Sequence, residues 1–257
     1  YVVQSNGSKL TRLTENRALE GEPLWAPDGE TLAFHASDDE TFELRSGYLW
    51  ILNPDTAELR RLEGQKTGEI DHLTWTPDGR SLLFNEVHGT NTNLYRIDVA
   101  SGRLEAVTRR TGTFRMEGSS RDRTRVAYTF GGFGTPSDLH ASDLNGERSV
   151  RLTRANSWVE DEILLPESQV VRWESRDGTP VEGILMLPHC HRQGTRVPLI
   201  LQIHGGPEGV SLDGWTTSYG DPVQLLAQCE QLTELQLVEG ALVRLVLEPR
   251  GGLDAPA

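Results

Sequence analysis

The chain has 257 residues, and its 25 basic against 38 acidic residues give a formal net charge of −13. This length allows one large domain or two ordinary ones. With 36% hydrophobic residues and 26 glycines, the composition excludes intrinsic disorder, collagen and a coiled coil. The longest uncharged apolar run, near Val197–Ile203, is too short for the roughly 20 residues of a membrane helix. We therefore expect no membrane partner, and the acidic balance argues against nucleic acid as a partner.

Only two cysteines are present, Cys190 and Cys229, and they are too few and too far apart for a CxxC site or a disulfide framework. This usage fits a reducing compartment, and no signal peptide is visible, so we expect a cytoplasmic protein. The sequence begins at Tyr1, inside a predicted strand, which indicates truncation at this end and leaves room for a leader upstream. Nothing in the pattern indicates an oligomeric state.

Two segments fifty residues apart carry the same motif. Leu24–Gly29 reads Leu-Trp-Ala-Pro-Asp-Gly and Thr74–Gly79 reads Thr-Trp-Thr-Pro-Asp-Gly, and each is followed by a short apolar run. A third copy keeps Asp122 but has Arg123 where the others have glycine. Pro-Asp-Gly between two apolar runs favours a tight turn, because proline sets φ, aspartate bonds the local backbone and glycine tolerates positive φ. Each copy therefore predicts a strand, a turn and a second strand.

A second motif recurs every 45 residues, with a leucine near its start and an aliphatic residue at its end. Its copies begin at Leu49, Leu94 and Leu139 and end at Leu62, Val107 and Leu152. Short strands repeated every ~40–50 residues are typical of β-propeller blades. We read about three and a half WD40/TolB-like blades in residues 1–157, an incomplete propeller, since closed propellers use ~4–8 blades. The aromatic residues of the repeats are interpreted as packing between blades: Trp25, Trp50, Trp75 and Tyr95.

The period stops after Asn156, and a linker is expected over residues 158–168. Gln169–Glu174 then alternates, meets the turn signal Asp177-Gly178, and is followed by a predicted return strand over Val181–Leu187. This pattern predicts a β-hairpin at the start of a second domain, residues 169–257.

A continuous apolar run over Val197–Ile203 predicts a strand buried on both faces. It leads directly into His204-Gly205-Gly206-Pro207. Apolar residues at 3–4 spacing predict a helix over 222–239, and another strand is predicted over Leu242–Leu247. Strand, helix and strand after an antiparallel hairpin indicate the opening of an α/β sheet.

The blade motif Trp-x-Pro-Asp-Gly, the run Val171–Gly183 (Val-Arg-Trp-Glu-Ser-Arg-Asp-Gly-Thr-Pro-Val-Glu-Gly) and His204-Gly205-Gly206-Pro207 occur in this order. In this the chain resembles the prolyl oligopeptidase family of serine peptidases, and its acylaminoacyl-peptidase-like branch most. The resemblance implies a mostly β chain, with an incomplete propeller followed by the N-terminal part of an α/β-hydrolase domain. It also implies short peptides as substrates, a Ser-Asp-His triad, no cofactor, and a propeller that limits access to the site.

Oxyanion-hole chemistry can explain why glycines follow the predicted strand. In α/β-hydrolases the loop after the third strand gives a backbone N–H to the oxyanion hole, and one such donor contributes roughly 2.7–4 kcal/mol. By resemblance, Gly206 is the first choice for this donor and Gly205 the second.

The nucleophile segment is missing, since no Gly-x-Ser-x-Gly elbow occurs in the chain. The nearest string surrounds Ser218, but no strand precedes it, Thr216 replaces the first glycine, and all seven histidines lie before it. In the family the elbow follows the segment that matches Pro249-Arg250-Gly251. We therefore expect an inactive fragment that does not hydrolyse peptides.

Other interpretations have less support in the sequence. His189-Cys190-His191 could suggest a metal site, but it offers no fourth ligand, and we expect a solvated loop and no metal. A different class of function is a non-catalytic, TolB-like propeller that binds a protein partner, which the repeats alone do not exclude. A third hypothesis is that the chain is unstable, because an open propeller edge exposes apolar surface.

Overall fold

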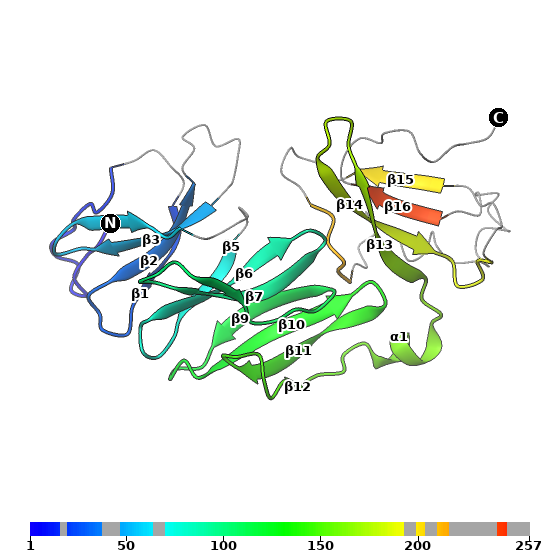
Figure 1. Cartoon of the computed structure of the whole chain (residues 1–257). Helices are drawn as coiled ribbons and strands as arrows, with labels where there is room; N and C mark the ends of the chain where they lie inside the picture. The colour runs from blue at the N-terminus through cyan, green and yellow to red at the C-terminus, as the bar shows by residue number, and fades with distance from the viewer. Residues whose placement is uncertain are drawn as a thin grey trace.

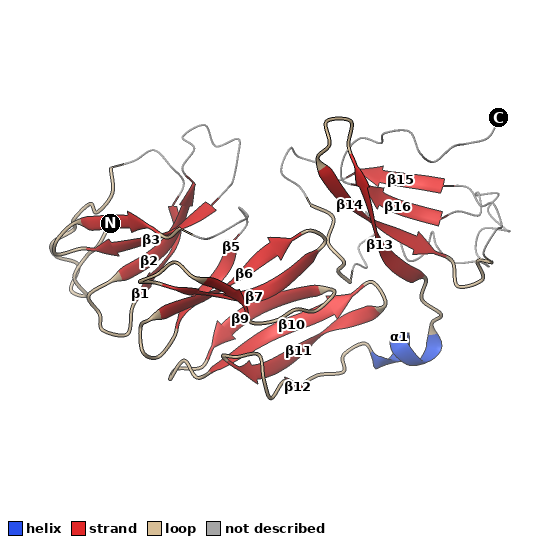
Figure 2. Cartoon of the chain, viewed as in Figure 1, coloured by secondary structure: helices blue, strands red, loops and turns tan. Residues whose placement is uncertain are grey.

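The computed structural model describes seven stretches of the chain: residues 1–15, 20–37, 47–63, 70–192, 199–203, 210–215 and 241–245. Within them the protein is almost entirely strand, with one short helix (Figure 2). The strands form three sheets, and the first two contain three four-stranded units that follow one another in chain order (Figure 1). No helix in this part of the chain is long and apolar enough to cross a membrane.

Each unit is an antiparallel meander. Unit 1 contains β1 (Glu20–Trp25), β2 (Leu32–Ser37), β3 (Gly47–Asn53) and β4 (Glu58–Arg61). Unit 2 contains β5 (Ile70–Trp75), β6 (Ser81–His88), β7 (Asn91–Asp98) and β8 (Leu104–Ala106). Unit 3 contains β9 (Thr113–Ser119), β10 (Arg125–Gly132), β11 (Thr135–Asp143) and β12 (Val150–Arg151).

The first strands of the units lie next to one another, because β1 contacts β5 and β5 contacts β9. A parallel bridge between Thr92 and Thr113 joins β7 to β9, so units 2 and 3 share one sheet. This arrangement confirms the expectation of a mostly β, propeller-like fold. The remaining half of the three and a half expected blades would lie before unit 1, and there the described residues form one isolated bridge, between Val2 and Thr11.

The repeated turn is the same in all three units. Its third residue has positive φ in each copy: Gly29 at 76°, Gly79 at 67° and Arg123 at 55°. The aspartate before it accepts a hydrogen bond from the backbone N–H two residues later, with distances of 2.9 Å for Asp28, 3.1 Å for Asp78 and 3.2 Å for Asp122. Arg123 therefore adopts the glycine-like conformation of the other copies, and the loss of glycine does not change the turn.

The 45-residue repeat corresponds to the same backbone hydrogen bond in each unit. In each unit the closing residue donates its backbone N–H to the carbonyl of the opening leucine. The pairs and distances are Leu62 to Leu49 at 2.8 Å, Val107 to Leu94 at 2.8 Å, and Leu152 to Leu139 at 2.7 Å. The spacing thus marks the point at which the fourth strand returns to the third.

Apolar side chains fill the spaces between units. Trp75 is 1% exposed and donates its indole N–H to the carbonyl of Leu24, 3.1 Å away, which ties unit 2 to unit 1. Tyr95 packs against a buried cluster from units 1 and 2, as expected, whereas Trp50 packs against a cluster from unit 1. Trp25, the counterpart of Trp75, is 40% exposed. The packing interpretation is wrong for Trp25, because in the described residues no sheet lies before β1.

The third sheet has the order β13-β14-β16-β15. Its strands are β13 (Glu167–Glu174), β14 (Pro180–Leu187), β15 (Leu199–Ile203) and β16 (Ala241–Leu245). The predicted hairpin is confirmed, with Gly178 at φ 87° in its turn. The two later strands are also present, and they pair in parallel. The predicted helix over 222–239 lies outside the described residues.

A short helix, α1 (Ser157–Glu162), overlaps the start of the predicted linker, and the sequence pattern did not indicate it. Val159 is its buried residue, at 4% exposed. The helix lies where the chain leaves unit 3 and approaches β13 (Figure 1).

Candidate functional site

The predicted oxyanion residues Gly205 and Gly206 lie outside the described residues, as does Ser218. The structure does describe the two segments that flank residues 204–207, the glycine loop that the sequence predicts. These are β15, which leads into it, and residues 210–215, which follow it. The candidate site is therefore built from the elements that hold these flanking segments.

The parallel pairing of β15 with β16 fixes the edge of the sheet from which the glycine loop departs. Ile203 pairs with Leu245 at the carboxyl ends of the two strands. Carboxyl ends of parallel strands lie at one edge, and ligands of open α/β sheets bind outside that edge. The residues after Ile203 and after Leu245 therefore start from the same edge of the sheet.

Beyond the glycine loop, Asp213 attaches the chain to units 2 and 3. Its backbone N–H donates to the carbonyl of Thr90 at 2.6 Å, in the turn between β6 and β7. Its Oδ1 accepts the N–H of Phe133 at 3.1 Å, in the turn between β10 and β11. Asp213 is only 7% exposed. The segment around it, orange in Figure 1, is thus anchored on the ends of two propeller-like units.

The hairpin of the third sheet contacts the same turn of unit 2. Glu182 on β14 accepts the backbone N–H of Thr90 through Oε2 at 3.2 Å, and its Oε1 accepts a hydrogen bond from Arg172 on β13 at 2.6 Å. A Cβ at Gly89, where φ is 59°, would lie 2.1 Å from Oε2 of Glu182. Both polar groups of the Thr90 backbone therefore bind the second part of the chain, and glycine at 89 permits the close approach.

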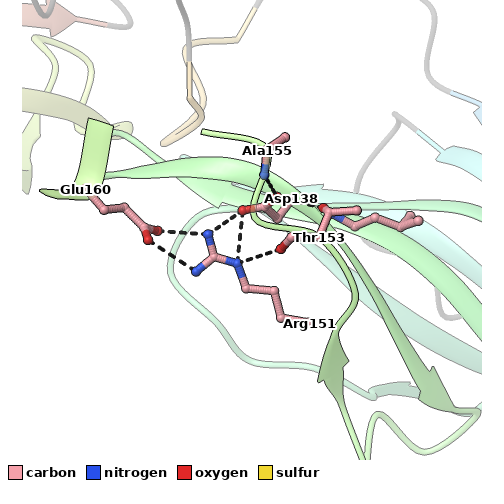
Figure 3. Close-up of polar contacts among 6 residues, drawn as sticks. Asp138, Arg151, Thr153, Ala155 and Glu160 are labelled. Carbon is pink, nitrogen blue, oxygen red and sulfur yellow. Dashed lines mark hydrogen bonds and ion pairs between the residues drawn. The ribbon is translucent and has the colours of Figure 1, made fainter. Parts of the chain in front are cut away.

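A third junction holds α1 against unit 3 (Figure 3). Asp138 on β11 accepts hydrogen bonds from the hydroxyl of Thr153 at 2.6 Å, the N–H of Ala155 at 3.0 Å and Nε of Arg151 at 3.0 Å. The guanidinium of Arg151 also pairs with Glu160 of α1 at 3.0 Å. One aspartate thus connects β11, β12 and the segment that leads to the third sheet.

The side chain of Asp138 is 1% exposed. Burial on its own raises the pKa of this carboxyl, but the hydrogen bonds from Thr153, Ala155 and Arg151 outweigh burial and lower the pKa below its usual value of 3.8. The carboxylate is therefore ionised at neutral pH and serves as the acceptor at the centre of the junction.

His189, Cys190 and His191 lie just beyond β14. Cys190 is disulfide-bonded, which differs from the inference of a reducing compartment drawn from the two cysteines. In the described part of the chain, no three histidine, cysteine, aspartate or glutamate side chains are grouped to hold a metal ion. Sequence reasoning missed the anchoring residues Asp213 and Glu182. No motif of the sequence includes Asp213, and Glu182 falls within the predicted return strand of the hairpin, where nothing marks it as a contact residue.

No protein-family model matches the chain, but curated relatives do. Dipeptidyl-peptidase 5 of Porphyromonas gingivalis is 23% identical over 218 residues, which is 84% of this chain and 31% of the relative. Dipeptidyl-peptidase 5 of Aspergillus fumigatus is 22% identical over 210 residues, 77% of this chain and 28% of the relative. The uncharacterized peptidase YuxL of Bacillus subtilis is 38% identical over 72 residues, 28% of this chain and 11% of the relative. The chain spans less than a third of the length of these relatives.

Two solved structures share the fold. Acylaminoacyl peptidase of Pyrococcus horikoshii matches with a TM-score of 0.63 and 18% identity, over 85% of this chain and 31% of that one. AtxE2 isopeptidase with Astexin3-dC4 bound matches with a TM-score of 0.61 and 21% identity, over 87% of this chain and 32% of that one. At these identities the match concerns the fold.

Proposed function

We propose that the chain is part of a serine peptidase of the prolyl oligopeptidase family. The peptidase relatives and the peptidase structures support this proposal, at low identity over most of the chain. The substrates of this peptidase would be short peptides. The observation that carries the proposal is that peptidase relatives align with a chain whose glycine loop starts at the carboxyl edge of a parallel strand pair.

In this proposal, a serine attacks the peptide carbonyl, a histidine moves the proton, and an aspartate orients the histidine. All three would lie beyond residue 257, so the chain alone would be an inactive fragment. Gly206, or else Gly205, would donate its N–H to the oxyanion. Residues 1–157 would restrict access as a partial propeller, residues 158–168 would link, and residues 169–257 would begin the α/β-hydrolase domain.

The topology of the third sheet supports the hydrolase assignment. An antiparallel hairpin is followed by a parallel pair, which needs a crossover connection of a dozen or more residues, usually a helix. Residues 204–240 provide a connection of sufficient length. The alternative, a TolB-like propeller that only binds a protein, gives no reason for this sheet.

The test uses the product of the coding frame extended through a downstream Gly-x-Ser-x-Gly segment. We expect this product to hydrolyse short peptides, and Gly206→Pro, which removes the N–H, to lower kcat by roughly 10²–10³-fold. Gly205→Pro tests the second choice in the same way, and we expect it to lower kcat less than Gly206→Pro. An extended product without peptidase activity, or an active one whose kcat is insensitive to both substitutions, would contradict the proposal.

A further inference from the structure

A cavity of about 410 Å³, lined mostly by residues with polar side chains, opens in unit 2, beside the turn that contacts Asp213. One wall is β7, with Asn91, Asn93 and Tyr95. The other is the connection from β8 to β9, with Arg109 and Arg110. This volume lies in the range of small-molecule sites, which combine a shaped cavity with a few fixed polar groups.

The backbone around the cavity is held by two asparagines of β7. Oδ1 of Asn93 accepts the N–H of Arg110 at 2.9 Å, and its Nδ2 donates to the carbonyl of Arg110 at 3.2 Å. Oδ1 of Asn91 accepts the N–H of Gly112 at 2.7 Å. The segment that carries the two arginines is therefore fixed at Arg110 and Gly112, which limits the entropy lost when a ligand binds.

The charge in the cavity is positive in a chain whose net charge is −13. Among the residues that the structure describes, no carboxylate forms an ion pair with Arg109 or Arg110. The guanidinium of Arg110 lies 3.6 Å from the centroid of the Phe130 ring. Stacking fixes the plane of a guanidinium and leaves its N–H groups at the edge available.

Arg109 also acts on Tyr95 in the opposite wall. Burial, and then the charge of Glu86, raise the pKa of the Tyr95 hydroxyl, and the charge of Arg109 opposes that shift. Glu86 is buried on β6 and does not line the cavity. A positive group and a protonated hydroxyl thus face the same space, and both can donate hydrogen bonds to an anion.

We infer that this cavity binds a carboxylate group of a peptide, with Arg109 as the main donor and Arg110 and Tyr95 beside it. Guanidinium groups match the planar geometry of carboxylates with two parallel hydrogen bonds. Asn91 adjoins Thr90, whose backbone holds Asp213 and Glu182, so a peptide held here lies next to the junction with the third sheet. The choice of a peptide as the carrier of the carboxylate rests on the proposed function, whereas the binding does not require catalysis.

The test is isothermal titration calorimetry of the 257-residue chain at low ionic strength. The probes are acetyl-Ala-Ala-Phe with a free carboxylate, its C-terminal amide, the amide with an internal glutamate, and inorganic phosphate. We expect the free acid or the glutamate peptide to bind at least about tenfold more tightly than the plain amide, since hydrogen bonds to charged groups contribute about 1.5–3 kcal/mol. Which of the two binds assigns the carboxylate to a C-terminus or to a side chain.

Arg109→Gln should remove this preference, and Arg110→Gln should weaken it. Arg121→Gln is the matched control, because Arg121 is exposed in the turn at the opposite end of β9 and β10. It should leave the preference intact, and unchanged melting of the three variants would show that each is folded. Equal binding of acids and amide, no binding of either acid at millimolar concentration, tighter binding of phosphate, or a preference that survives Arg109→Gln would each overturn the inference.

Discussion

The carboxylate of Asp213 accepts a hydrogen bond from the backbone N–H of Phe133, which lies 80 residues earlier in the chain. With the bond from the Asp213 N–H to Thr90, it fixes the segment after the glycine loop on units 2 and 3. The two parts of the chain are thus joined through the backbone of propeller-like turns.

This junction predicts that two substitutions of Asp213 lower the free energy of unfolding by different amounts. Asp213→Ala removes the acceptor of a buried N–H and should lower the free energy of unfolding by about 1–3 kcal/mol. Asp213→Asn keeps an acceptor oxygen and should cost less. Urea unfolding of both variants measures the difference. Equal losses would show that the bond to Phe133 contributes little.

The contact between Gly89 and Glu182 predicts that alanine lowers stability more at position 89 than at position 29. Gly89→Ala places a Cβ at positive φ and 2.1 Å from the Glu182 carboxylate, whereas Gly29→Ala meets positive φ but nothing within 4 Å. Gly29→Ala should lower stability by about 1–2 kcal/mol, the cost of the left-handed conformation, and Gly89→Ala by more. Thermal or urea unfolding compares them. If the excess is due to Glu182, Glu182→Ala should remove it, and persistence of the excess would contradict the contact.

The repeat provides a matched pair of tryptophans. Trp75 is buried between units 1 and 2, so Trp75→Ala should lower the free energy of unfolding by about 3–5 kcal/mol. Trp25 holds the same place in unit 1 but is 40% exposed, so Trp25→Ala should cost clearly less. Guanidinium unfolding measures both, and similar losses would contradict the packing described for unit 1.

Asp138 predicts a dependence of stability on pH. Because the pKa of this carboxyl is lower in the folded than in the unfolded chain, its contribution is complete above about pH 3.8 and is lost as the pH falls through the folded-state pKa. Asp138→Asn should therefore be destabilised at pH 6 relative to the parent chain, with a smaller difference near pH 3. Unfolding at the two pH values tests this, with the exposed Asp161→Asn as control. A difference that does not change with pH would assign the effect of Asp138 to hydrogen bonding alone.

The repeated units and the hairpin could be predicted because turn chemistry is local. Pro-Asp-Gly and Asp177-Gly178 specify their turns within a few residues, and the turn at Arg123 survives the loss of glycine because its aspartate bond is retained. The 45-residue spacing likewise reflects one hydrogen bond per unit.

The anchoring contacts could not be predicted, because they join residues distant in sequence through backbone groups that every residue carries. Neither Thr90 nor Phe133 has a pattern that marks it as a partner of Asp213. The helix α1 was missed for another reason: six residues with one buried side chain are too few for a helical period to be visible.

The proposal to test first is that the chain is part of a serine peptidase and that its nucleophile is a serine outside these 257 residues. Incubation with a fluorophosphonate probe, followed by mass spectrometry, tests it most directly. We expect no label on the 257-residue chain, and a label on the serine of the Gly-x-Ser-x-Gly segment in the extended product. A label on the 257-residue chain that disappears in Ser218→Ala, or an extended product that stays unlabelled, would contradict the proposal.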